Sequence, residues 1–101
     1  MQNFRSYKLA VQLYRKCLKL KLERHLQDQI NRASSSVALN LSEGRGRRTM
    51  KDQRRFFDIA FGSLREVQAI LDITNAHHDI IDLADKTAAH LYKLLHTLRH
   101  G

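Results

Sequence analysis

The sequence of 101 residues contains no proline, no tryptophan, four glycines and one cysteine. Without proline, and with so few glycines, little in the chain would break a helix, so long helices are the default. The single cysteine, Cys17, excludes an intrachain disulfide and fits a reducing compartment. The chain has no apolar run approaching about 18 residues, and no signal-peptide pattern. We therefore expect a soluble, cytoplasmic protein.

Strands have no support, because no window alternates strictly between apolar and polar residues. Instead, apolar residues recur at spacings of three and four, which is typical of amphipathic helices. The pattern predicts helices over roughly residues 3–20, 25–44, 50–75 and 79–99. Helices of this length joined by short links predict one all-α domain over residues 1–101, an antiparallel up-down-up-down four-helix bundle.

The apolar stripes identify the expected core. The first stripe contains Phe4, Tyr7, Ala10 or Val11, Tyr14, Cys17 and Leu18. The second contains Leu26, Ile30, Ala33, Val37 and Leu41, and passes through the serine run at 34–36 without a break. The third contains Phe56 or Phe57, Ala60, Leu64, Val67, Leu71 and Thr74, and the fourth Ile80 or Ile81, Ala84, Ala88, Leu91, Leu95 and Leu98. We interpret Cys17 as a core residue rather than a nucleophile.

Several large apolar residues fall outside these stripes. They are Leu39, Ile59, Phe61, Ile70, Ile73 and Leu83. Wide apolar faces often mean that a second surface is covered, so we expect a homo-oligomer.

Charge is the unusual property of this chain. The chain contains eighteen Lys and Arg and ten Asp and Glu, which give a formal charge of +8 and a pI near 10.2. This balance indicates a polyanionic partner, either nucleic acid or an anionic membrane surface, although a basic protein without such a partner is the alternative. The link expected between the second and third helices, around Gly44 and Gly46, is called the hinge. The hinge group of cations comprises Arg45, Arg47, Arg48, Lys51, Arg54 and Arg55. The first-helix group comprises Arg15, Lys16, Lys19, Lys21 and Arg24.

A run of charge is usually only a solvated face, but the hinge group is denser than most. It places six cations within eleven residues, where Thr49 and Asp52 predict the capped start of a helix. A helix N-terminus also favours phosphate, through its dipole and its free backbone N–H groups. We expect the hinge group to bind phosphates, assisted by Arg15, Lys16 and Lys19 of the first-helix group.

We expect four residues to have structural roles: three in the second helix near its end, and one in the third helix. Asn40 lies beside the second stripe, where its amide would need hydrogen-bond partners. Glu43 can pair with nearby arginines or with another subunit. Gly44, together with Gly46, is expected to end the second helix in a left-handed cap. Gly62 costs its helix about 1 kcal/mol relative to Ala, so we expect it to mark a close helix–helix contact.

The sequence offers little for catalysis or metal binding. His96 and His100 are four residues apart, but no nearby Cys or carboxylate completes a ligand set, so we expect surface histidines, no metal and no cofactor. The glycines of the hinge lack the preceding strand that phosphate-binding loops need. The serine run with His25 is the only faint catalytic candidate, and we expect no enzyme activity.

Two motifs give the chain a specific resemblance: N-x-x-E-G at residues 40–44 and A-x-G-S-L-x-E at residues 60–66. Together with residues 29–33, 36–47 and 55–66 they make the chain similar, over nearly its whole length, to the bacterial four-helix bundle family. This family is also called the S23 or 23S rRNA intervening-sequence protein family. The resemblance implies a four-helix bundle that often forms a ring-shaped homopentamer. The chain departs from many members because residues 19–25 contain neither glycine nor proline.

Members of this family occur as reading frames inside intervening sequences of 23S rRNA genes. Relatives are accessory proteins of diversity-generating retroelements, in which a basic pentamer is thought to bind nucleic acid and a reverse transcriptase. Arginine-rich surfaces bind RNA mainly through phosphates and stacking, and the sequence has no motif for base-specific reading. Two functions stay open: a non-catalytic protein that binds nucleic acid, RNA rather than DNA, and an oligomeric scaffold for a protein partner such as a reverse transcriptase.

Overall fold

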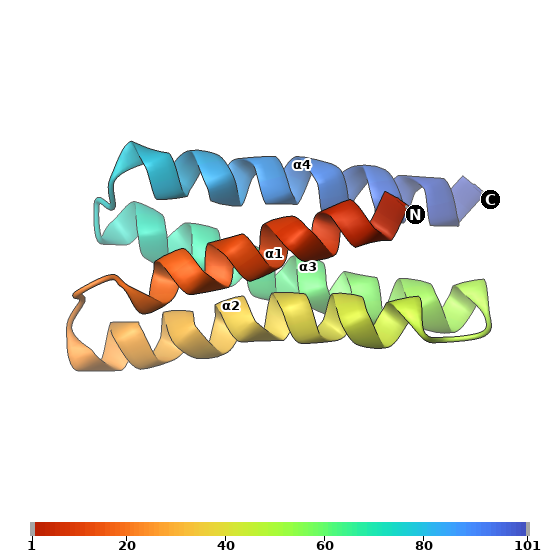
Figure 1. Ribbon diagram of the computed structural model, residues 1–101, viewed down its shortest axis with the longest axis horizontal. Coiled ribbons are helices and arrows are strands. Elements are labelled where there is room, and N and C mark those ends of the chain that lie inside the picture. Colours follow the sequence, from red (N-terminus) through yellow and green to blue (C-terminus); the bar gives the residue numbers. More distant parts are fainter. Residues whose placement is uncertain (1, 101) are drawn as a thin grey trace.

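The computed structural model describes the backbone of residues 2–100 and the side chains of residues 5–98. It contains four helices, α1 (Gln2–Leu18), α2 (Arg24–Arg45), α3 (Met50–Ile73) and α4 (His78–His100), and no strand within the described backbone (Figure 1). Helices α1 and α3 each pack against both α2 and α4. The predicted all-helical, four-helix fold is therefore confirmed.

The links between the helices lie at the two ends of a molecule 41 Å long. The α2–α3 link shares one end with the start of α1 and the end of α4 (Figure 1). The α1–α2 and α3–α4 links lie at the opposite end. None of the described helices is both long and apolar enough to cross a membrane.

Two helices end earlier than expected. Helix α1 stops at Leu18 rather than near residue 20, and α3 stops at Ile73 rather than near residue 75. Helix α2 extends one residue beyond its expected range at each end, and α4 begins and ends one residue outside its range. The backbone N–H of Leu20 donates to the carbonyl of Cys17 at 3.1 Å, a tight turn that ends α1.

The end of α3 is a Schellman motif around Asn75. Asn75 has a φ of 53°, which places it in the left-handed region that Asn tolerates better than most residues. Its N–H donates to the carbonyl of Asp72 at 3.1 Å, and the N–H of Ala76 donates to the carbonyl of Leu71 at 3.0 Å. These two bonds satisfy carbonyls that the helix leaves unpaired and turn the chain toward α4.

The α1–α2 link is closed by a side chain rather than by glycine or proline. Gln27, in the first turn of α2, donates from Nε2 to the carbonyl of Cys17 at 2.9 Å. Its Oε1 accepts the N–H of Leu22 at 3.2 Å, and the same Nε2 lies 2.8 Å from Oδ1 of Asn31. One amide therefore ties the end of α1 and the link to the second helix.

The stripe predicted for α1 is partly wrong. Leu9 and Leu13 are buried, whereas Tyr7 and Tyr14 are only partly buried and Leu18 is 46% exposed. The helix is rotated so that two aliphatic side chains enter the core and the tyrosine hydroxyls can stay near water. Ala10 and Cys17 are buried as expected, and the side chain of Phe4 lies outside the described residues.

The other three stripes are confirmed. Helix α2 buries Ile30, Ala33, Val37 and Leu41, α3 buries Phe57, Ala60, Leu64, Val67 and Leu71, and α4 buries Ile80, Ala84, Ala88, Leu91 and Leu95. At the ends of these stripes, Leu26, Thr74 and Leu98 are partly buried. Ile70, which the sequence places outside the core, is 4% exposed and belongs to it.

Cys17 is a core residue. Its side chain is fully buried, and burial raises the pKa of its thiol to about 11, although the nearby Ser34 hydroxyl acts in the opposite direction. Because the thiolate is the reactive form, a thiol that stays protonated near neutral pH is a poor nucleophile.

Replacing Leu64 with alanine tests the core. Leu64 is fully buried in the middle of α3, so the Leu64→Ala variant should lose about 2–5 kcal/mol of unfolding free energy. Leu39→Ala removes the same side chain from a site that is 67% exposed in the single chain, and serves as the matched control in urea denaturation of the monomeric protein. A loss below about 0.5 kcal/mol for Leu64→Ala would contradict the packing of α3.

Candidate nucleic-acid interface

The α2–α3 link begins at Gly46, which caps α2 with φ −84° and ψ −5°. The expected left-handed cap is therefore wrong, and no described glycine has a positive φ. Helix α2 instead ends in right-handed turns, in which the N–H of Gly46 donates to the carbonyl of Glu43 at 3.2 Å. The predicted start of α3 is confirmed, because Oγ1 of Thr49 accepts the N–H of Asp52 at 3.1 Å.

Gly44 lies inside α2 rather than at its end, and it is buried against α3. A Cβ atom at this position would stand 2.6 Å from Cε1 of Phe57 and 3.0 Å from Cβ of Phe56. Glycine thus lets the two helices approach closely at the hinge. The close contact predicted for Gly62 is wrong within this chain, since a Cβ there would meet nothing within 4 Å.

The first element of the hinge surface is an aromatic ring between two arginines. The guanidinium carbons of Arg47 and Arg55 lie 4.6 and 4.5 Å from the centroid of the Phe56 ring. Arg47 Nη2 also lies 2.7 Å from Glu43 Oε2, and Arg55 Nε lies 4.0 Å from Asp52 Oδ1. Both cations therefore have partners inside the hinge, and Arg47, which contacts Glu43 of α2 and Phe56 of α3, connects the two helices.

A glutamine closes this link too. Gln53 Nε2 donates to the backbone carbonyl of Arg47 at 3.0 Å. The Nε atom of Arg47 is buried without a hydrogen-bond partner among the described residues. Gln53 occupies the fourth position of α3, as Gln27 does in α2. Neither glutamine stands out in the sequence, because a single polar residue in a first helical turn has no recognisable pattern.

The other hinge cations lie around the start of α3. Arg45, Arg48 and Lys51 are exposed, and Arg54 is partly buried. Backbone N–H groups in the first turn of any helix have no carbonyl within that helix to bind. The hinge group is gathered at one end of the bundle, beside this helix start, where the N–H groups of Asp52 and Gln53 are already bonded to Thr49.

The first-helix group lies elsewhere. Arg15, Lys16 and Lys19 are exposed near the end of α1, whereas the hinge lies at the opposite end of the molecule (Figure 1). In a single chain these three cations therefore do not adjoin the hinge group, and their assistance in binding phosphate stays a prediction. The bundle separates the two basic groups along its length.

Asn40 takes part in a small polar network between α2 and α3. Its Nδ2 donates to the carbonyl of Ser36 at 2.9 Å and lies 3.0 Å from the Ser36 hydroxyl. The hydroxyls of Ser36 and Ser63 are 2.9 Å apart across the two helices. This hydrogen bond sets the two helices in register about two turns away from Gly44.

Comparison with known protein families gives one match. A family model described as 23S rRNA-intervening sequence protein matches residues 4–100. The matched span includes nearly all of the four helices and the whole hinge. Neither the comparison with curated proteins nor the comparison with solved structures found a match.

Two glycine substitutions test the hinge packing. Gly44→Ala places a methyl group against Phe57 and Phe56, so we expect it to cost about 1–3 kcal/mol of unfolding free energy. Gly62→Ala is the matched control, and should stabilise the protein by about 0.5–1 kcal/mol, because an open helical site only gains helix propensity. Thermal and urea unfolding measure both. Equal effects of the two variants would contradict the close approach at Gly44.

Proposed function

Because the chain belongs to the 23S rRNA-intervening sequence protein family, we propose that it is a non-catalytic protein that binds nucleic acid through phosphate contacts. RNA is the expected partner, rather than DNA. The observation that carries the proposal is the hinge group, with six cations within eleven residues gathered at one end of the bundle. The proposal requires no cofactor.

The physical basis is the attraction between this end of the molecule and a phosphate backbone. Each phosphate that a Lys or Arg neutralises releases condensed counterions, so binding gains entropy and depends steeply on salt. The positive end of the α3 dipole adds to the same attraction. Such contacts position a nucleic acid without reading its bases, so the proposed binding is tolerant of sequence.

The hinge cations have different roles in this proposal. Arg47 and Arg55 stack on Phe56 and pair with acidic side chains, so their charge is partly neutralised within the protein. We assign the phosphate contacts mainly to Arg48, Lys51 and Arg54. Arg47 and Arg55 then hold the surface in shape and add to its potential.

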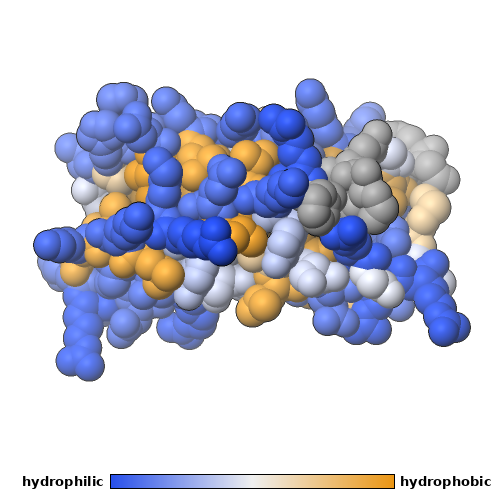
Figure 2. All heavy atoms as spheres, in the orientation of Figure 1, coloured by the Kyte–Doolittle hydropathy of each residue, from blue (hydrophilic) through white to orange (hydrophobic). Residues whose placement is uncertain are grey.

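We further propose that the chain is an up-down-up-down bundle that assembles as a homopentamer. The alternating positions of the links support the topology (Figure 1). Several large apolar side chains are exposed in the single chain, among them Leu39 at 67% and Ile73 at 70%. Contact with neighbouring subunits would cover such side chains. Figure 2 shows apolar side chains between hydrophilic ones on the face viewed. Several copies of a weak site would bind a long polyanion with avidity.

A scaffold that binds a protein partner is the second candidate. An open groove of about 380 Å³ lies between α3 and α4, and Arg65, Ala69 and Ile81 are among the residues that line it. Such a groove could accept side chains of a partner, for example a reverse transcriptase, with the basic charge playing no part. The two candidates differ in whether nuclease treatment and salt abolish the interaction.

Charge substitutions at the two ends of the bundle test the nucleic-acid proposal. The Arg48→Gln, Lys51→Gln, Arg54→Gln triple variant should weaken binding to single-stranded RNA of any sequence. It should also flatten the log–log salt dependence by about 2 units, since each phosphate contact contributes about 0.7. Fluorescence anisotropy over a range of salt concentrations measures both effects.

The control for this experiment removes the same charge at the other end. The Arg15→Gln, Lys16→Gln, Lys19→Gln variant should keep the wild-type slope within about 1 unit. If this variant loses affinity and the hinge variant does not, the first-helix group is the binding surface. If neither changes, the proposal fails and the scaffold becomes the better explanation.

Light scattering of the purified protein tests the assembly. We expect a mass five times the 11.8 kDa of one chain at micromolar concentration. A lysine in place of the exposed Ile73 or Leu39 should lower the mass if that residue lies in a subunit contact. A mass of 11.8 kDa for the wild-type protein would contradict the pentamer without affecting the bundle.

A further inference from the structure

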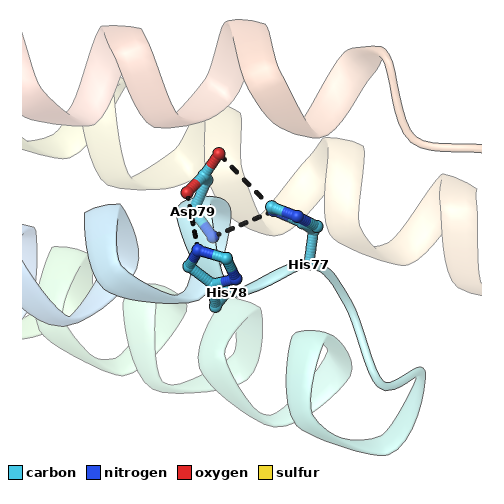
Figure 3. A group of neighbouring side chains, drawn as sticks. All are labelled: His77, His78 and Asp79. Carbon is cyan, nitrogen blue, oxygen red and sulfur yellow. Dashed lines mark hydrogen bonds and ion pairs between the residues drawn. The ribbon is translucent and has the colours of Figure 1, made fainter.

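The link between α3 and α4 brings two imidazoles to one carboxylate. His77 precedes α4, His78 begins it, and Asp79 lies in its first turn. Nδ1 of His77 lies 3.5 Å from Oδ2 of Asp79, and Nε2 of His78 lies 3.2 Å from Oδ1. Figure 3 shows one carboxylate oxygen directed toward each ring.

The backbone around this cluster is held by hydrogen bonds. The Schellman motif at Asn75 fixes the end of α3 two residues before His77. The N–H groups of Ile80 and Ile81 both donate to the carbonyl of His77, at 3.2 and 3.3 Å. The N–H of Asp79 donates to Nδ1 of His77 at 3.3 Å, so this ring caps the helix. The three side chains thus extend from one short turn whose backbone is held by hydrogen bonds.

The spacing of the donor atoms suits one metal ion. Ligands bound at 2.0–2.1 Å in a tetrahedral site stand about 3.4 Å apart. The two His–Asp distances, 3.5 Å to Oδ2 and 3.2 Å to Oδ1, are close to this value, although each ends on a different carboxylate oxygen. With one donor atom from each residue, all three atoms lie within 4.8 Å of one another. A set of two imidazoles and a carboxylate binds zinc and its first-row neighbours, whereas magnesium and calcium prefer sites made of oxygen ligands alone.

From these contacts, we propose that His77, His78 and Asp79 form a binding site for a divalent transition metal of the zinc class. His78 supplies Nε2 and the carboxylate supplies one oxygen or both, while His77 supplies Nδ1 once this nitrogen exchanges the N–H of Asp79 for the ion. The residues are 69%, 76% and 65% exposed at their side chains, so the remaining coordination positions face solvent. Such a site binds reversibly and leaves a position for an outside ligand. It lies at the opposite end of the bundle from the hinge and does not depend on the proposed function.

The surroundings on α3 and α4 favour a cation. Residues 66–85 contain no Lys or Arg, and Asp72 and Asp82 are exposed in this segment. The basic α1–α2 link lies at the same end, so the acidic environment is confined to the α3–α4 side. His90 lies in the opposite environment, because the pKa of its ring is lowered by partial burial and then by Arg5 and Lys93 among nearby cations.

Calorimetric titration of the untagged protein with Zn²⁺ tests the site. We expect one ion per chain, and millimolar Mg²⁺ should not compete. His78→Gln and Asp79→Asn should each weaken Zn²⁺ binding by at least about tenfold, as the loss of one ligand of three implies. Because both side chains are exposed, these substitutions should leave the core unchanged. Circular dichroism checks that the variants stay helical.

Two histidine variants are matched controls. His25 Nδ1 lies 3.7 Å from Glu23 Oε2, and this ion pair includes only one imidazole. His90 lies near the cations Arg5, Lys93 and Lys86. His25→Gln and His90→Gln should bind Zn²⁺ as the wild type does. A second readout is the melting temperature, which bound Zn²⁺ should raise in the wild type and these controls but not in His78→Gln.

Two results would overturn the proposal. One is wild-type Zn²⁺ affinity in His78→Gln, which would place any bound ion on other histidines. The other is the absence of binding at millimolar Zn²⁺, in which case the cluster serves only as a set of surface ion pairs that cap α4.

Discussion

The hinge of this molecule depends on the close approach of α2 and α3 at Gly44. A side chain there would meet Phe57 at 2.6 Å, so even a methyl group would push α3 away from α2. Phe57 is 1% exposed and leads the buried stripe of α3, while its neighbour Phe56 faces the surface of the hinge. Because the two rings are adjacent on one helix, the contact that seats Phe57 in the core also sets the position of Phe56. A packing constraint in the core thereby determines where the arginines of the hinge can stack.

This coupling gives the hinge cations two kinds of role. Arg47 and Arg55 each give up part of their exposure to cover Phe56, and each lies near a carboxylate. Their contacts stabilise the link modestly, as exposed cation–π and ion pairs usually do. The exposed Arg48 and Lys51 have more freedom to meet a phosphate. A basic surface built in this way keeps its shape in the free protein, so less ordering is required when a polyanion binds.

Much of the fold could be predicted because three helices carry one clear stripe each. In α3 the spacing from Phe57 through Leu64 to Leu71 leaves a single face that can be buried. In α1 the choice was ambiguous, because Tyr7, Leu9, Leu13 and Tyr14 are all large and largely apolar, and only packing against α2 and α4 selects the leucines. The glycines were misread for a related reason: their roles depend on which atoms of other residues lie opposite, and sequence spacing does not contain that information.

The candidate site shows the same limit more sharply. The hinge cations are close in sequence and meet around one short link, so their gathering was predictable, whereas the shared ring of Phe56 depends on how the link folds. The separation of the first-helix group could have been derived from the sequence. Helix α2 has 22 residues, and at 1.5 Å per residue it spans about 33 Å between its two links. Any helix of that length places the cations before it and those after it at opposite ends. An RNA segment that contacts both groups on one chain must therefore extend along most of the bundle, while a short one can engage only a single end.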